Sequence, residues 1–330
     1  MPEWLHEAGI GEERAILVEG ATILAARIDW GEPLRAGHVA MARITRRIAG
    51  TRRGYARFAD GSETQVEALP PEASEGRELR LRVTRAAIAE KGRTKLPQAR
   101  PAAPGEAEGP APSLLEALRA EGHAVRPLRV TDRHFDEAGW PELVEEALSG
   151  EVAFAGGSLA ISATPAMTLV DIDGPPPLPA LCLAAVPAIA AALARLDIGG
   201  AVGIDFPSLP EKKDRQAVDA ALAAALDHMR IERTAMNGFG FVQLVSRLER
   251  PSLVARFARD PAAAAARMLL RQAERVAAPG VLHLLAAPSV CRALRQEWRD
   301  ELARRTGRAV VVEERAGLAL AGGFAQAVAP

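Results

Sequence analysis

The chain has 330 residues and a formal net charge of −1, so its overall charge does not indicate nucleic acid as a partner. Its length allows about two or three domains with cores of their own. Its two cysteines, Cys182 and Cys291, lie far apart, which excludes a disulfide scaffold and a zinc site built from cysteine pairs. Because free thiols suit a reducing compartment and no apolar run reaches spanning length, we expect a cytoplasmic protein without membrane contact.

The N-terminal segment, residues 1–38, is expected to contain a β-hairpin. Apolar stretches at 15–18 and 22–28 flank the turn Glu19-Gly20-Ala21. This is the pattern of two strands joined by a tight connection. We expect the segment to pack on the catalytic part of the chain.

Short strands separated by turns fill residues 39–97. The pattern predicts strands at 39–48, 54–58, 64–69 and 78–83. Several short strands in so small a segment predict an inserted β-barrel of the OB type, a fold that follows nucleic-acid backbones. Residues 43–100 also hold fourteen Lys or Arg against seven Asp or Glu, so this part of the chain is basic. We therefore expect the barrel to bind RNA.

Two aromatic residues of the predicted barrel lie among arginines. Tyr55 and Phe58 are neighbours of Arg52, Arg53 and Arg57. On a regular strand the two rings point to opposite sides, so at most one of them can stack on a base. The alternative is that both rings belong to the core and the arginines form a solvated face.

A linker and two short helices are expected next. Residues 98–113 are rich in proline, glycine and alanine, which is typical of a linker. Ser113 can cap a helix that runs to residue 120, and a second helix is expected at 140–148. Strands at 152–154 and 159–161 flank a glycine turn.

Two apolar runs that end in aspartate carry the clearest chemical signal. Residues 166–173 end in Asp171 and Asp173, and residues 199–205 end in Asp205. An Ala/Leu-rich stretch at 178–196 is long enough to be a crossover helix, so the two strands are expected to be parallel. Parallel strands end at the same edge of a sheet, where open α/β sheets bind ligands. The three carboxylates are therefore expected to meet.

Aspartates gathered in this way suit a hard cation. Like charges held close together are costly unless one is protonated or a cation lies between them, and aspartate oxygens suit Mg²⁺ or Mn²⁺. The alternative is that these are ordinary aspartates at strand ends.

After residue 205 the sequence predicts a helix at 211–229, a strand at 239–244 and a small C-terminal α/β unit. Lys212 and Lys213 lie in the first turn of that helix, where cations oppose the helix dipole, so they either meet phosphate or form a solvated helix end. The C-terminal unit, residues 256–330, is expected to contain a helix at 262–276, a strand at 281–285, a helix at 290–305 and a strand at 309–313.

The order of these segments resembles the ribonuclease E/G family of bacterial endoribonucleases. Residues 12–29 are similar to the family's opening hairpin, and residues 90–97 (EKGRTKLP) are similar to the segment that leaves its RNA-binding OB domain. Residues 156–173 are similar to the Gly-Gly-X-Leu-Val-Ile to Ile-Asp-Val-Asn run of its catalytic domain. Residues 199–206 (GGAVGIDF) and 240–247 (GFVQLVSR) are similar to two further strands of that domain.

The resemblance implies a site and an activity. The family's two metal-binding aspartates fall on Asp171 and Asp205, and the family's asparagine is Asp173 here. Lys91 falls on a lysine that holds RNA near the scissile bond. The expected activity is Mg²⁺-dependent hydrolysis of single-stranded RNA, and the alternative is a non-catalytic RNA-binding protein on a decayed scaffold.

Departures from the family pattern carry predictions of their own. Neither the 5′-monophosphate pocket motif nor the Cys-Pro-X-Cys zinc link is found in the sequence, so we expect no 5′ sensing, no zinc and, if two chains pair, a homodimer without a zinc link. Residues 114–165 would be a shortened RNase H-like remnant, and residues 166–255 the catalytic domain. The predicted fold class is mixed α/β, with a parallel-strand-containing catalytic domain, an inserted barrel and a small C-terminal α/β domain.

Overall fold

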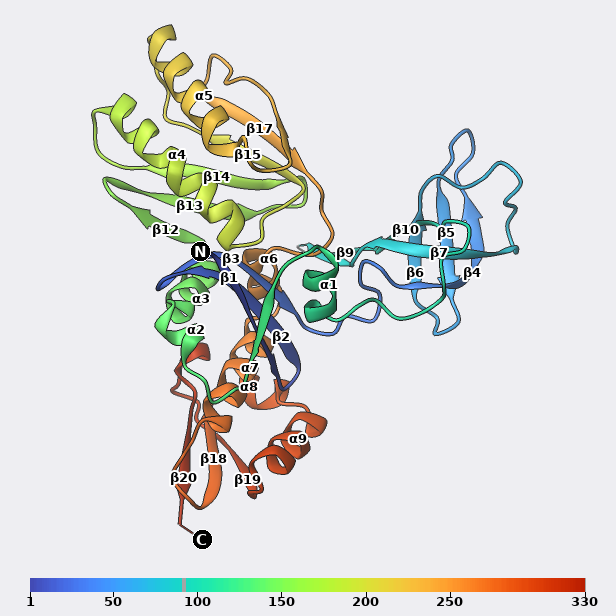
Figure 1. Ribbon diagram of the computed structural model, residues 1–330, viewed down its shortest axis with the longest axis vertical. Coiled ribbons are helices and arrows are strands. Elements are labelled where there is room, and N and C mark those ends of the chain that lie inside the picture. Colours follow the sequence, from blue (N-terminus) through green and yellow to red (C-terminus); the bar gives the residue numbers. More distant parts are fainter. Residues whose placement is uncertain (91–92, 330) are drawn as a thin grey trace. The chain divides into compact units, whose positions relative to one another are not determined.

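The computed structural model describes residues 1–90 and 93–329, drawn in Figure 1. They divide into two compact units. Unit 1 comprises residues 1–31, 118–148 and 256–330, and unit 2 comprises residues 32–117 and 149–255. Each unit therefore joins stretches that are far apart in the sequence, and the mixed α/β class predicted from the sequence is confirmed.

A closed five-stranded barrel forms one part of unit 2, as predicted. The strand order is β10-β6-β5-β4-β7. The strands are β4 (Val39–Arg47), β5 (Gly54–Phe58), β6 (Glu63–Val66), β7 (Glu78–Arg85) and β10 (Gln98–Pro101). Apolar side chains that alternate along these strands fill the interior, among them Ile44, Phe58, Val66, Leu81 and Val83. The sequence prediction missed β10, which closes the barrel inside the segment expected to be a linker. A separate two-stranded hairpin precedes it, β8 (Ile88–Glu90) with β9 (Arg93–Lys95).

A six-stranded mixed sheet forms the other part of unit 2. Its order is β12-β13-β14-β15-β17-β16, and β14 and β15 are its parallel pair. The strands are β12 (Glu151–Phe154), β13 (Gly157–Ala163), β14 (Thr168–Asp173), β15 (Ala201–Asp205), β16 (Ile231–Arg233) and β17 (Phe241–Ser246). The helix α4 (Leu178–Arg195) connects the parallel strands, which confirms the predicted crossover, and α5 (Lys212–Leu226) follows β15.

The two faces of this sheet differ. Val170, Ile172, Val202 and Ile204 alternate along β14 and β15 and are buried. The helices α4 and α5 lie side by side on one face of the sheet (Figure 1). The intervening residues of β14 are exposed. We call the face that carries Leu169, Asp171 and Asp205 the open face.

The helix α4 is long and apolar enough to cross a membrane by length and composition, although the sequence analysis expected no such run. Its buried side chains include Leu181, Val186 and Ile189, which lie in the core of unit 2. The core helix of a globular domain meets the same criteria.

Unit 1 contains a four-stranded sheet in the order β11-β1-β2-β3. The strands are β1 (Glu3–Gly9), β2 (Glu12–Glu19), β3 (Thr22–Asp29) and β11 (Val125–Leu128), with the helices α2 (His134–Glu137) and α3 (Trp140–Ser149). The predicted hairpin is β2 with β3. The structure adds β1 before the hairpin and β11 beside β1. The helix α1 (Leu114–Ala120) begins after Ser113, whose Oγ accepts a hydrogen bond from the backbone N–H of Glu116 at 3.2 Å, so the predicted cap is confirmed.

The C-terminal part of unit 1 has a three-stranded sheet in the order β19-β18-β20. Its elements are α6 (Leu253–Arg259), α7 (Pro261–Glu274), β18 (Val281–Ala286), α8 (Pro288–Ala293), α9 (Gln296–Thr306), β19 (Val310–Glu314) and β20 (Phe324–Val328). The single helix predicted at 290–305 is wrong, because Leu294 is extended and only 2% exposed. The side chain of Arg299 donates to the carbonyls of Cys291 and Leu294, both at 3.1 Å, and so satisfies acceptors that the break leaves without helical partners.

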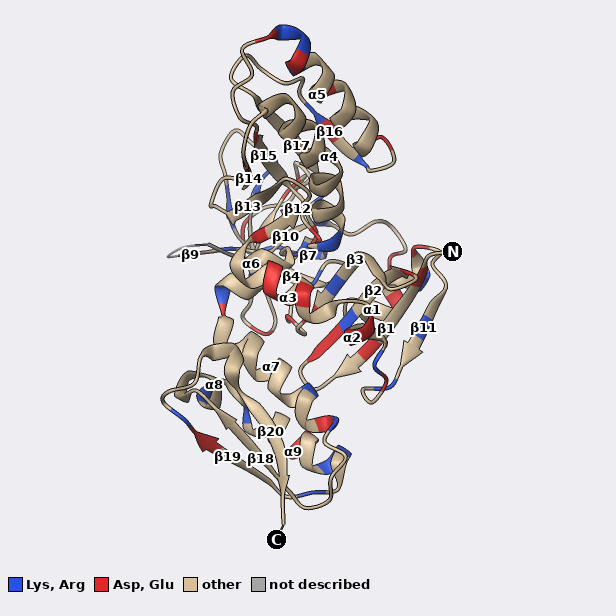
Figure 2. Ribbon diagram, turned by 90° about the vertical axis from the view of Figure 1, so that its left-hand side faces the viewer, with Lys and Arg blue, Asp and Glu red and all other residues tan. Residues whose placement is uncertain are grey.

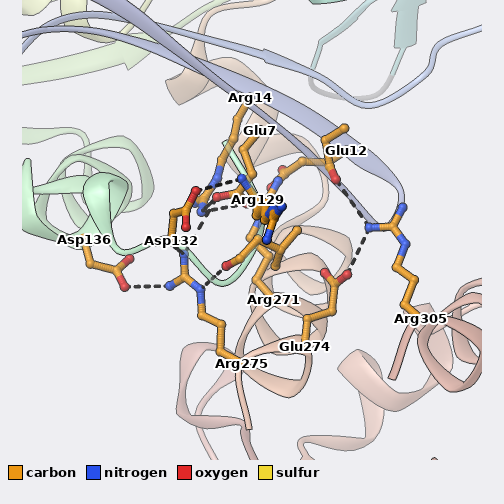
Figure 3. A network of polar contacts seen from close by, with 12 residues as sticks. Glu7, Glu12, Arg14, Arg129, Asp132, Asp136, Arg271, Glu274, Arg275 and Arg305 are labelled. Atoms are coloured by element: carbon orange, nitrogen blue, oxygen red, sulfur yellow. Dashed lines mark hydrogen bonds and ion pairs between the residues drawn. The ribbon is translucent and has the colours of Figure 1, made fainter. Parts of the chain in front are cut away.

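A buried ionic network lies in the core of unit 1 (Figure 3). Glu7 is fully buried, and both its carboxylate oxygens accept hydrogen bonds from Nη2 of Arg14 at 3.2 Å. Arg271 of α7 contacts the same carboxylate and also donates from Nε to Glu12 at 2.7 Å. The network therefore joins β1 and β2 to a helix that the chain forms much later.

Candidate metal site on the open face

Two aspartates occupy matching positions on the central parallel strands. Asp171 of β14 and Asp205 of β15 are paired in the register of the sheet, and both are exposed. Neighbouring strands lie about 4.8 Å apart, so the two backbones hold these carboxylates side by side. The alternation that buries Val170 and Ile204 on the helix-covered face directs both aspartates to the open face. The predicted convergence of Asp171 and Asp205 therefore agrees with the register.

Asp173 does not join them as a third ligand in the described structure. It follows Asp171 by two residues on the same face of β14 and pairs with Ser158 of β13, beyond the last pairing of β14 with β15. A step of two residues along a strand covers about 6.6 Å. Within residues 1–90 and 93–329 no group of three or more His, Cys, Asp or Glu side chains could hold a metal ion. The expectation that three carboxylates meet is therefore wrong, because the strand separates Asp173 from the pair.

The donor set of the pair fits Mg²⁺. This ion keeps several of its waters and is usually bound by one or two carboxylates together with substrate phosphates, so it does not need a third protein carboxylate. Asp171 Oδ1 accepts a hydrogen bond from the backbone N–H of Ile172 at 3.0 Å, which restrains that carboxylate. Two exposed carboxylates in register also repel each other, and a cation between them removes the repulsion.

An apolar patch borders the aspartates on the open face, and the sequence analysis missed it. A Cβ atom added to Gly203 of β15 would come within 2.5 Å of Phe241 Cζ and 3.0 Å of both Leu169 Cδ2 and Met167 Sδ. These three side chains therefore close over the bare backbone of Gly203, two residues before Asp205. A glycine inside a strand often marks such a close approach, and that signal was present in the sequence.

The predicted RNA-binding aromatics of the barrel have different environments. Phe58 is 5% exposed and belongs to the barrel core, so it presents no face for stacking and its assignment as an RNA contact is wrong. Tyr55 is half-buried, and the guanidinium of Arg46 lies 4.5 Å from its ring centroid. Strand alternation explains the difference, since residues three apart point to opposite sides.

The predicted RNA-binding cations lie on the surface where the structure describes them. Arg53 pairs with Glu67 at 3.6 Å and Arg57 with Glu63 at 2.6 Å, which offsets part of their charge. Arg52 donates to the carbonyls of Ala68 and Leu69. Lys212 and Lys213 are exposed at the start of α5, where Figure 2 shows basic residues. Lys91 lies outside the described residues.

Comparison with known proteins identifies the segment that carries the aspartates. A search of curated proteins gives no significant match. The model of the ribonuclease E/G family matches residues 113–248, which include β14, α4, β15 and β17. The resemblance seen in the sequence is thus supported, and residues 113–248 of this chain are similar to the ribonuclease E/G family.

Proposed function

We propose that this protein is a Mg²⁺-dependent endoribonuclease that hydrolyses phosphodiester bonds in single-stranded RNA. The observation that carries the proposal is the register of Asp171 with Asp205 on two exposed strand positions, inside the segment that matches a ribonuclease family. The family match itself supports RNA as the substrate.

Different residues of the chain would hold the metal ion, orient the water and position the RNA. Asp171 and Asp205 would hold the ion, which when bound polarises the scissile phosphate and makes a water more acidic. Asp173, exposed and two residues further along β14, would orient the attacking water by accepting a hydrogen bond from it. Tyr55, Lys91, the barrel arginines and the two lysines that begin α5 would position the RNA backbone, so little base specificity is expected from these contacts.

The rival proposal is an RNA-binding protein whose nuclease scaffold no longer cleaves. One observation favours it: the closed barrel and its exposed Arg53 and Arg57 could bind RNA whether or not the aspartate pair holds an ion. Cleavage of a single-stranded RNA in Mg²⁺, its loss in EDTA and its loss in Asp205→Asn would establish the nuclease. RNA binding without cleavage in Mg²⁺ or Mn²⁺ would establish the rival.

We also propose that two chains pair without zinc and that the protein works in the cytoplasm. On the C-terminal sheet Val311, Phe324 and Val328 are exposed, and such apolar side chains could bury one another in a dimer. Both cysteines are free and buried, which suits a reducing compartment. Light scattering and metal analysis on one preparation test the assembly.

A further inference from the structure

An exposed phenylalanine lies beside the aspartate pair. Phe239 is 83% exposed, about twice as much as Phe324, which is 42% exposed. It sits in the turn Asn237–Gly240 that leads into β17. Asp205 pairs with Phe241 in the sheet register, and Phe239 precedes Phe241 by two residues. Its Cα therefore lies within about 12 Å of that of Asp205, from one strand spacing and two residue steps.

The turn that carries Phe239 is built from several hydrogen bonds. Asn237 Oδ1 accepts from the backbone N–H groups of Phe239 at 2.9 Å and Phe241 at 3.0 Å. The carbonyl of Gly240 accepts from the N–H of Phe206 at 3.2 Å, which ties the turn to the residue after Asp205. Gly240 has φ +91°, and a Cβ there would lie 2.6 Å from the carbonyl oxygen of Phe206. The backbone under the exposed ring is thus held against the end of β15.

We propose that Phe239 is a stacking platform for a nucleobase that flanks the scissile phosphate. This inference rests on the proposed function, because the aspartate pair defines where the phosphate lies. An exposed aromatic ring is costly in water, and stacking with a base recovers that apolar contact without reading the base identity. The apolar patch over Gly203, which includes Leu169 and Phe241, extends the same surface toward the aspartates.

Binding in EDTA tests the stacking without requiring cleavage. With a fluorescein-labelled single-stranded RNA of mixed sequence, Phe239→Ala should bind roughly 5- to 150-fold more weakly than wild type, the range for one lost base–aromatic stack. Phe239→Trp should keep the affinity and Phe239→Leu should not, since leucine has no π-face. Leu183→Ala on α4 is the matched control, because Leu183 is 42% exposed in the same unit but lies on a helix that covers the opposite face. The control should bind as wild type does.

Abasic substitutions along the RNA locate the stacked base. In wild type one position next to the bond cleaved in Mg²⁺ should lose affinity when its base is removed, and Phe239→Ala should be insensitive to that loss. Unchanged affinity in Phe239→Ala, or equal sensitivity to the abasic site, overturns the inference even if cleavage is intact. A change in molecular mass by light scattering with unchanged RNA affinity would show that the ring contacts a second chain instead. Absence of cleavage with the stacking results intact would overturn the proposed function alone.

Discussion

Replacing Glu7 by glutamine should destabilise unit 1 severely, although it removes only one charge. Glutamine keeps the volume of the side chain, so no cavity forms. Glu7 is fully buried, and Arg14 and Arg271 are 2% and 7% exposed at their side chains. Both guanidinium groups would lose their shared counter-charge in the core. Burial already lowers the pKa of Arg14 to about 9, which shows how strongly this site disfavours an uncompensated cation.

The expected loss is about 3–5 kcal/mol, the cost of removing one partner of a buried ion pair. It is a large share of the ~5–15 kcal/mol that stabilises a typical domain. With a urea m-value of about 2 kcal/mol/M, the midpoint of unfolding should fall by roughly 2 M.

Tryptophan fluorescence measures this loss in unit 1 alone. All four tryptophans, Trp4, Trp30, Trp140 and Trp298, lie in that unit. The matched control is Glu3→Gln on the same strand, since Glu3 accepts from Arg126 at 3.1 and 3.2 Å but is exposed. Its expected cost is about 0–1 kcal/mol. If the two variants unfold at the same urea concentration, burial does not determine how much the network contributes to the free energy of unfolding, and the reasoning fails.

Four further predictions concern the site and its surroundings. Asp171→Asn and Asp205→Asn should each abolish cleavage and leave RNA affinity nearly unchanged, as gel assays and binding titrations on the same preparations would show. Asp173→Asn restores the family's asparagine and keeps an acceptor oxygen for the water, so it should keep or raise the rate. Two fully active variants at Asp171 and Asp205 would contradict the site assignment. The logarithm of RNA affinity should fall with the logarithm of salt concentration by roughly 0.7 per phosphate contact, and a salt-independent affinity would exclude binding by the basic barrel. Asp219 accepts hydrogen bonds from both terminal nitrogens of Arg233, at 2.6 and 3.2 Å, and this ion pair lowers the pKa of Asp219. The stabilisation by the pair should be complete above the ordinary aspartate pKa of about 3.9 and be lost as pH falls through the folded pKa. Asp219→Asn lacks the pair, so thermal melts at pH 6 should separate wild type from the variant and melts near pH 2 should not. A 5′-monophosphate should give no rate advantage over a 5′-hydroxyl and the purified protein should hold no zinc, so stoichiometric zinc or a clear preference for the monophosphate would contradict the interpretation of the missing motifs.

Local patterns predicted those features that short stretches of chain determine. The alternation around Val170 and Ile172 and the helix-length spacing to Asp205 predicted the parallel pair, but not the register that pairs Asp171 with Asp205. The period-2 argument also indicated that one of Tyr55 and Phe58 had to face inward, but not which one. That choice depends on the whole barrel, because Phe58 belongs to a core that also includes Ala99 of the fifth strand, β10. The local sequence of β10 is typical of a linker.

Long-range contacts account for what the sequence could not predict. The break before Arg295 places Leu294 in a core made with α7 and β18, and no local propensity marks it. The exposure of Phe239 depends on a turn that is fixed by Asn237 and by the end of another strand. Asp173 does not meet the other two aspartates because β14 continues for two residues beyond Asp171, whereas β15 ends at Asp205, the partner of Asp171.

Because unit 1 is formed from three separated stretches, its last residues are synthesised only after those of unit 2. Unit 2 contains no residue beyond 255, whereas unit 1 includes residues 256–330. Glu12 can contact Arg271 only after a further 259 residues have been synthesised. A ribosome adds them in roughly 13–50 s at about 5–20 residues per second. During that interval the nascent chain can already hold a finished aspartate pair while β1 to β3 lack the helix that neutralises and covers their buried acids. The last quarter of the chain therefore completes the packing of the first thirty residues.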